Sequence, residues 1–308
     1  MNKQAIIFTE IVNSAKIGAV MLSSFQRHHK GMPILVFGQQ SDFDELKELS
    51  KQFKINPKYI GAVVISNDIK QSYNNGGHLG TAKIFSYMIA NHRHVDFLIH
   101  LDSDIYSKKP SVNDLMEKLQ NHAIVGTRRC YKNNPSKALV DPKAPDAMST
   151  YFMGFDLNWV TNHKEDLLTK LVVGSYNPYY SSTLDFFDPL TFNIYSNGGT
   201  PHFLPNTVYG GQDENGSKVT SYKANMHFDC GDNLIHFGGV GSGLAYLNGL
   251  NRSEKSYGQW AIGRYALFAK LFYNEDIGYS EPTQYDALGR WVNGSHDKAI
   301  LDLIKMEI

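Results

Sequence analysis

The chain has 308 residues, of which 42% are hydrophobic and 19% charged, so it is not a disordered polymer and is long enough to bury a core without disulfide bonds. Thirty basic residues balance thirty acidic ones, which gives no reason to expect non-specific binding to nucleic acid or acidic membranes. The two cysteines, Cys130 and Cys230, are far apart, which favours reduced thiols. With no signal-peptide pattern and no transmembrane segment in view, we expect a cytoplasmic protein.

Short apolar runs alternate with amphipathic stretches in the first half of the chain. The runs are Ala5 to Phe8, Ile34 to Phe37, Ala62 to Ile65 and Phe97 to Leu101. The stretches between them place apolar residues on one helical face each, in the sets Ile17, Val20, Met21 and Ser24; Phe43, Leu46, Leu49 and Phe53; and Ala82, Phe85, Ser86 and Ile89. This rhythm predicts an α/β fold in which a mixed, mostly parallel sheet is flanked by helices on both faces.

Polar residues follow two of these predicted elements before the middle of the chain. Thr9 and Glu10 end the first predicted strand. The stretch from Asn74 to Lys83 contains a Gly-Gly pair, is predicted to follow a strand and opens a helix, so its amides can face an anion. It matches neither the P-loop nor the dinucleotide-binding glycine pattern, and an ordinary turn with a surface lysine is the alternative.

The strongest chemical pattern is the predicted strand Phe97 to Leu101, which ends in Asp102-Ser103-Asp104. Ligands of open α/β sheets bind outside the carboxyl ends of the strands, and this strand delivers two carboxylates there. Such a pair can share a hard divalent cation whose remaining ligands are phosphate oxygens and water. The alternative is a turn or helix-capping role before Pro110. A second triplet, Asp42-Phe43-Asp44, lies in a charged, helix-like stretch and is expected to be solvated surface.

The second half of the chain is rich in Tyr, Asn, Gly, Ser and Pro between Tyr176 and Gly249, which predicts long binding loops with short strands. His236 lies in this half and is followed by four glycines within seven residues. A neutral imidazole is a good ligand for Mn²⁺, and glycines let backbone amides approach phosphate. A histidine satisfied inside the core is the competing interpretation.

These motifs together resemble the nucleotide-sugar glycosyltransferases of the GT-A fold, through the strand-end Asp-x-Asp, the aromatic-x-x-Gly-hydrophobic segment Tyr151 to Asp156 and the late histidine with its glycine loop. The resemblance implies that Asp102, Asp104 and His236 bind Mn²⁺ or Mg²⁺. It further implies contacts to the nucleotide-sugar donor, from residues in four parts of the chain: Thr9; Gly77, His78 and Lys83; Asp102 and Ser103; Gly239 and Ser242.

A general base for the acceptor hydroxyl is sought among aspartates of the loop-rich half. The triplet that begins at Asp229 resembles an acceptor-side Asp-Thr-Gly of some bacterial relatives, and Asp188 is a second candidate; Asp185 and Asp232 remain alternatives. Each can equally be a turn or cap residue. A retaining enzyme needs no dedicated base, so the stereochemistry stays open.

A regular helix is predicted again after Ser253, where Tyr257, Trp260, Ala261, Arg264, Tyr265, Phe268 and Leu271 recur at helical spacing, and a last short helix is predicted from Ala299 to Ile304. We therefore expect a catalytic domain over 1–250, with a nucleotide-binding half over 1–110 and a donor-sugar and acceptor half over 111–250. Residues 251–308 are expected to form a C-terminal helical extension.

The sequence thus predicts transfer of a sugar from a nucleoside diphosphate sugar, with UDP favoured, to an acceptor hydroxyl. Aromatic residues of the loop-rich half favour a glycan or cell-surface polymer as acceptor; they are Tyr176, Tyr179, Tyr180, Phe186, Phe187, Tyr195 and Tyr209. A modified base in DNA is an alternative acceptor, with basic clusters at 27–30 and 128–132 to form a groove. A non-catalytic nucleotide- or glycan-binding module and a dehalogenase-like phosphatase are rival classes. Oligomeric state is left open.

Overall fold

The computed structural model describes residues 3–74, 77–129, 147–162, 191, 194–195, 197–204, 206–209, 226–229, 234–249 and 255–278. The first half contains β1 (Ala5–Glu10), α1 (Ala15–His28), β2 (Ile34–Gly38), α2 (Gln40–Gln52), β3 (Ile60–Val64), α3 (Asn67–Asn74), α4 (Gly77–Asn91), β4 (Phe97–Leu101), β5 (Ile105–Ser107), α5 (Val112–Leu119) and β6 (Ile124–Arg129). Later elements are β7 (Ala147–Asp156), α6 (Leu157–Asn162), β8 (Pro201–Leu204), β9 (Asn206–Tyr209), β10 (Met226–Asp229), β11 (Leu234–His236), α9 (Val240–Leu247) and α10 (Lys255–Tyr273).

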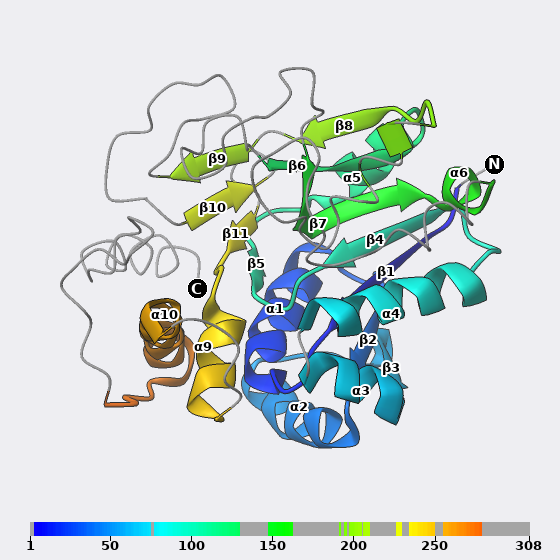
Figure 1. Ribbon diagram of the computed structural model, residues 1–308. Coiled ribbons are helices and arrows are strands. Elements are labelled where there is room, and N and C mark those ends of the chain that lie inside the picture. The colour runs from blue at the N-terminus through cyan, green and yellow to red at the C-terminus, as the bar shows by residue number, and fades with distance from the viewer. Residues whose placement is uncertain are drawn as a thin grey trace.

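A seven-stranded sheet in the order β3-β2-β1-β4-β7-β6-β8 forms the centre of the molecule (Figure 1). Strands β1, β2, β3 and β4 pair in parallel, while β7 runs antiparallel to both of its neighbours, β4 and β6. Strand β8 pairs in parallel with β6. The predicted mixed, mostly parallel sheet is therefore confirmed, with β7 as the strand of opposite direction.

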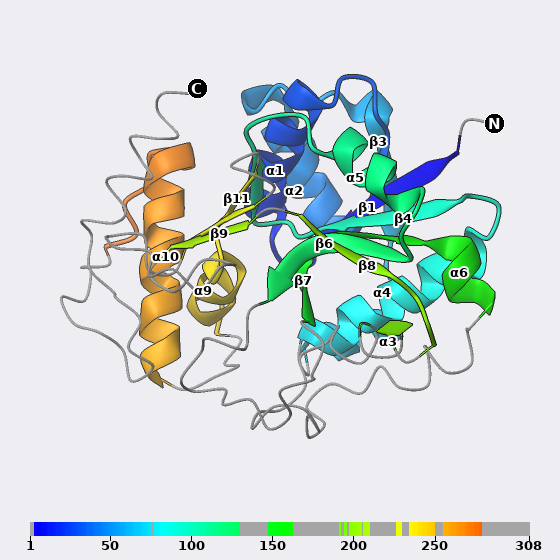
Figure 2. The ribbon, with the colours of Figure 1, turned by 90° about the horizontal axis from the view of Figure 1, so that it is seen from above.

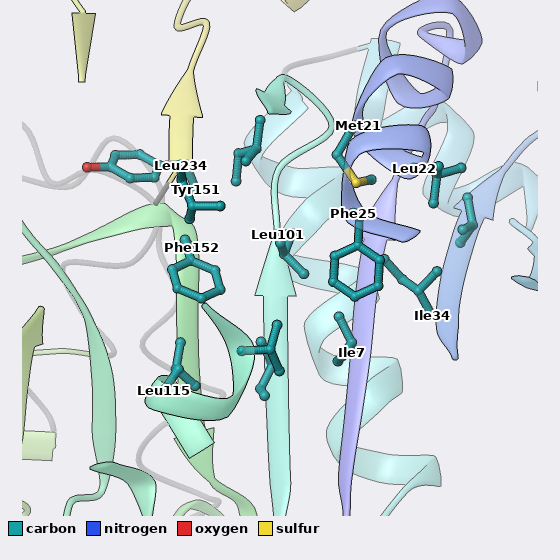
Figure 3. Packing of buried hydrophobic residues seen from close by; sticks show 14 of the residues in the cluster. Ile7, Met21, Leu22, Phe25, Ile34, Leu101, Leu115, Tyr151, Phe152 and Leu234 are labelled. Atoms are coloured by element: carbon teal, nitrogen blue, oxygen red, sulfur yellow. The ribbon is translucent and has the colours of Figure 1, made fainter. Parts of the chain in front are cut away.

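Helices cover both faces of this sheet, and each face has its own hydrophobic core. Alternate strand residues such as Ile7 and Ile99 pack with α1, α2 and α5 on one face, and Figure 3 shows Met21, Leu22 and Phe25 of α1 in this cluster. Residues of the opposite pleat, such as Phe8 and Leu98, pack with α3, α4 and α6. Because side chains alternate along a strand, strands covered on both faces read as continuous apolar runs, as the sequence indicated.

A smaller antiparallel sheet, in the order β5-β11-β10-β9, adjoins the main sheet where β4 ends. A third core joins this sheet to α1, α9 and α10 through residues such as Ile17, Ile235 and Phe268. Figure 2 shows α9 and α10 side by side beyond these short strands. Gly243 permits this packing, because a Cβ there would meet the carbonyl oxygen of Ala261 on α10. The third core fixes β11 and α9 against the first half of the chain.

For most strands and helices predicted from the sequence, the observed boundaries lie within two residues of the predicted ones, as in β1, β2, β4 and α10. Two expectations were wrong. Asp42 is 5% exposed rather than solvated, because its carboxylate accepts backbone hydrogen bonds from Asn13 (3.0 Å) and Gln39 (2.7 Å). The stretch from Asn74 to Lys83 was predicted to follow a strand, but the element that precedes α4 along the chain is helix α3. The helix predicted from Ala299 to Ile304 lies outside the described residues.

Within the described part of the chain, no helix combines the length and the apolar character needed to cross a membrane.

Candidate metal centre

The Asp102-Ser103-Asp104 triplet forms the turn that connects β4 of the main sheet to β5 of the small sheet. The sequence predicted the two acids at the end of this strand, and the structure places them in the turn directly after β4. Strand β11 pairs antiparallel with β5, with His236 opposite Ile105. The amide of Phe237 also donates to the carbonyl oxygen of Asp104, at 2.8 Å. This pairing brings a histidine from the second half of the sequence to the end of β4.

Ligand atoms of Asp102, Asp104 and His236 all lie within 4.8 Å of one another. His236 Nε2 is 3.3 Å from Asp104 Oδ1, and these two side chains are each 15% exposed. The Tyr151 ring, on β7, stacks on the His236 ring at a centroid separation of 4.3 Å, which fixes the plane of the imidazole. The side chain of Asp102 is 29% exposed, so a ligand from solvent can reach the cluster.

A second cluster shares Asp102 and lies deeper in the protein. It consists of Glu10, His100 and Asp102, whose ligand atoms also lie within 4.8 Å of one another. His100 Nε2 is 2.8 Å from Glu10 Oε2 and 3.7 Å from Asp102 Oδ1. His100 has no exposed surface and Glu10 is 9% exposed. Three carboxylates and two imidazoles are therefore concentrated at one end of β1 and β4.

Burial raises the pKa of the Asp102 carboxyl above its ordinary value. His100 and His236 act in the opposite direction, whereas the neighbouring charges of Asp104 and Glu10 raise the pKa further. A divalent cation next to these carboxylates would reverse this balance, because it favours their ionised form. The electrostatics of the site therefore favour the binding of a cation.

The residues fit Mn²⁺ or Mg²⁺. Carboxylate oxygens are the ligands these ions prefer, and imidazole is acceptable to Mn²⁺. Three protein side chains leave coordination positions for oxygens of another ligand, and the partial exposure of Asp102 provides access. Asp102, Asp104 and His236 are the residues that would hold the ion.

Gly239 and Ser242, which the sequence placed near the diphosphate, lie directly beyond His236. Gly239 is the N-terminal cap of α9 and has a φ of 92°, a left-handed conformation that glycine adopts without strain. Ser242 is in the first turn of α9 and is partly exposed. The end of β11 therefore turns immediately into the N-terminus of a helix, next to the metal-ligand candidate.

The other predicted donor-binding residues are placed less favourably. Thr9 is fully buried on β1, so its side chain does not face solvent. Lys83 pairs with Asp68 of α3, at 2.7 Å, on the exposed side of the two helices. Ser103 is partly exposed between the two aspartates. Gly77 and His78 are the first residues of α4. The side chain of His78 is outside the described part of the structure.

The two general-base candidates have little or no structural description. Asp229 is the last residue of β10, where its backbone pairs with Leu234 of β11; its side chain is not described. Asp188 lies outside the described residues. Of the basic cluster at 27–30, Arg27 and Lys30 are exposed, whereas His29 is buried, at 5% exposed.

Sequence reasoning missed Glu10 and His100 as members of the site, and it singled out Tyr151 as part of a motif without its contact to His236. Glu10 was noted only as a polar residue at the end of a strand, and His100 was part of an apolar run. A histidine inside an otherwise apolar strand two residues before an acidic pair was a signal available in the sequence, since a buried imidazole needs a hydrogen-bonding partner.

No protein-family model matches this chain, and no curated protein matches it. Solved structures resemble it at low identity. The WbbM bifunctional glycosyltransferase in its apo form is 13% identical, with a TM-score of 0.47 over 67% of this chain and 39% of that protein, so the alignment spans well under half of WbbM. Mouse xyloside xylosyltransferase 1 is 16% identical, with a TM-score of 0.45 over 66% of this chain and 86% of that one. The galactosyltransferase LgtC, in complex with donor and acceptor sugar analogs, is 10% identical, with a TM-score of 0.41 over 66% of this chain and 73% of that one.

Proposed function

We propose that this chain is a metal-dependent glycosyltransferase that moves a sugar from a nucleoside diphosphate sugar, with a UDP-sugar favoured, to an acceptor hydroxyl. The observation that carries the proposal is the convergence of Asp102, Asp104 and His236 at the carboxyl end of β4. Ligands of α/β sheets bind at this edge, and Mn²⁺ or Mg²⁺ held by two carboxylates shares its remaining positions with phosphate oxygens. A diphosphate is therefore the ligand that this site suits best.

The protein's own residues bind and orient the donor in this proposal. Asp102 and Asp104 supply the negative charge that attracts the ion. His236, whose ring stacks on Tyr151, supplies a neutral nitrogen ligand. An ion held by these three residues would supply positive charge next to the leaving diphosphate as the bond to the sugar breaks. We propose that Gly239 and the amides at the start of α9, which follow His236 directly, contact the phosphates.

The acceptor side of the proposal rests on the sequence and, for Asp229, on the pairing of β10 with β11. A glycan or cell-surface polymer is the proposed acceptor, and Asp229 or Asp188 the proposed base that takes the proton of its hydroxyl as the new glycosidic bond forms. Asp229 is favoured by position, since its strand β10 pairs with the strand that ends in His236.

Thermal unfolding tests the donor site without knowledge of the acceptor. The midpoint is measured with UDP, GDP, CMP and dTDP, each with Mn²⁺ and with EDTA, because a ligand that binds only the folded state raises it. We expect a metal-dependent rise with one nucleotide, most with UDP, that is lost in Asp104→Asn. The matched control is Asp44→Asn, which changes an exposed aspartate of the second Asp-x-Asp triplet and should leave the rise intact. Absence of any metal-dependent rise in the wild type would contradict the proposal.

A further inference from the structure

A buried chain of hydrogen bonds lies behind Asp102 and has no part in the proposal above. Tyr73 of α3 contacts the hydroxyl of Thr81, on α4, at 3.1 Å, and Thr81 donates to Glu10 Oε1 at 2.8 Å. Glu10 Oε2 lies 2.8 Å from His100 Nε2. The His100 ring is packed against Phe8 and Phe85, with centroid separations of 5.1 and 4.9 Å. The imidazole is thus held in one orientation, with Nε2 directed at two carboxylates.

The position of the proton follows from the acceptors. A carboxylate only accepts hydrogen bonds, so Nε2 of His100 carries the hydrogen that lies between it and Glu10. One N–H forms one strong bond, and the 2.8 Å contact to Glu10 is that bond. The 3.7 Å separation between Nε2 and Asp102 Oδ1 is longer than a hydrogen bond. Asp102 therefore faces the imidazole across an electrostatic contact and is not bound by it.

We propose that Glu10 and His100 are positioning residues of the cation site: Glu10 accepts the hydrogen bond from the Nε2–H of His100, so that the Asp102 carboxylate keeps its oxygens for the cation. This inference rests on the proposed function, because it assumes that Asp102 binds the ion. Partners behind metal ligands of this kind change metal affinity by about 10- to 100-fold when they are altered.

Leucine removes the acceptor that Glu10 provides. Two donors, the Thr81 hydroxyl and the His100 N–H, face the two oxygens of Glu10. A leucine side chain has no hydrogen-bond acceptor, so both bonds are lost. The Asp102 carboxylate, 3.7 Å from His100 Nε2, is then an alternative acceptor for the imidazole. His100 then competes with the cation for Asp102.

The test measures binding of Mn²⁺ alone to the full chain, from the electron paramagnetic resonance signal of the free hexaaqua ion. We expect Glu10→Leu to raise the Kd for Mn²⁺ about 10-fold. Adding His100→Leu removes the competing N–H, so the double variant Glu10→Leu/His100→Leu should bind Mn²⁺ more tightly than Glu10→Leu alone. Glu275→Gln is the matched control, because Glu275 pairs with Lys16 instead and should leave the Kd unchanged.

The outcomes separate this inference from the proposed function. Loss of Mn²⁺ binding in Asp104→Asn together with an unchanged Kd in Glu10→Leu would overturn the inference alone. A double variant that binds no more tightly than Glu10→Leu would also overturn it, since a purely structural role predicts further damage. Mn²⁺ binding that survives Asp104→Asn would overturn the proposed function itself.

A measurement on the wild-type protein does not depend on whether the variants fold. The Nε2–H of His100, assigned in ¹H–¹⁵N spectra of the wild type by nuclear Overhauser contacts of its ring to Phe8 and Phe85, should be present without metal and should persist when Mg²⁺ is added. A His100 ring that carries no hydrogen on Nε2 would overturn the inference.

Discussion

His29 offers a quantitative test of the fold, because it caps helix α5 from another element. It follows α1, is 5% exposed and stacks on Phe25 at a centroid separation of 4.5 Å. Its Nε2 accepts from the backbone amides of Ser111 (3.0 Å) and Val112 (3.3 Å), at the start of α5. Its Nδ1 donates to the carbonyl oxygen of Phe25, at 3.1 Å. The ring must therefore be neutral, since a protonated Nε2 cannot accept.

The magnitude of the effect follows from proton linkage. Burial is the main cause that lowers the pKa of His29 below 6.5, with a smaller lowering from His28 and an opposing contribution from its bond to Phe25. Below about pH 6.5 the unfolded chain binds a proton at this residue that the folded chain does not, so stability falls as the pH drops. For one such residue, the free energy of unfolding falls by at most about 1.4 kcal/mol between pH 7.5 and pH 5.5.

Urea denaturation of the wild type and of His29→Phe at pH 7.5 and 5.5 measures both parts of this prediction. Phenylalanine keeps the stacking on Phe25 but leaves the two amides of α5 without an acceptor, which should cost about 1–3 kcal/mol at pH 7.5. The variant should lose less stability than the wild type on acidification, by up to about 1.4 kcal/mol. An equal loss of stability in both proteins would refute the capping role of the neutral imidazole.

Three further substitutions are predicted from packing and charge. Gly154→Ala should lower stability by about 1–3 kcal/mol in urea melts, because its Cβ would lie 2.5 Å from Leu115 and 2.8 Å from Leu119 on α5. Gly243→Ala should destabilise the packing of α9 on α10 by about 3 kcal/mol and should weaken Mn²⁺ binding, because His236 would be displaced. Gly241→Ala should do neither, because the added Cβ would lie in open space. Equal melting temperatures of these two variants would contradict the packing of α9 on α10. Lys83→Ala removes an exposed ion pair with Asp68, so the free energy of unfolding should change by less than about 1 kcal/mol. The stabilisation by nucleotide should persist in this variant. Loss of that stabilisation would indicate that Lys83 binds the donor.

The sequence predicted the strands well where their residues are buried on both faces. Continuous apolar runs such as Phe97–Leu101 correspond to β4, which has helices on either side. Helix α10 was predicted from its aromatic spacing. Asp42 was misjudged because its burial depends on backbone amides of another loop, at Asn13, which spacing within one helix cannot reveal.

The site was predictable only in part, because it depends on contacts between distant segments. The acidic pair was visible from its place after β4, and His236 from the glycines that come after it. What the sequence lacked was the pairing of β11 with β5 that brings His236 to Asp104, and the pairing of β1 with β4 that brings Glu10 to His100. Neither pairing leaves a pattern within a single segment, so Glu10 and His100 were overlooked.

Release of the nucleoside diphosphate from a panel of nucleoside diphosphate sugars, with Mn²⁺ and with EDTA, is the most direct test of the proposed function. The protein is compared with Asp104→Asn and His236→Ala, and with Asp44→Asn as the control outside the site. We predict metal-dependent release from one donor, most from a UDP-sugar, that both site variants abolish without a change in fold and that the control retains. Full metal-dependent release by Asp104→Asn would contradict the proposed function.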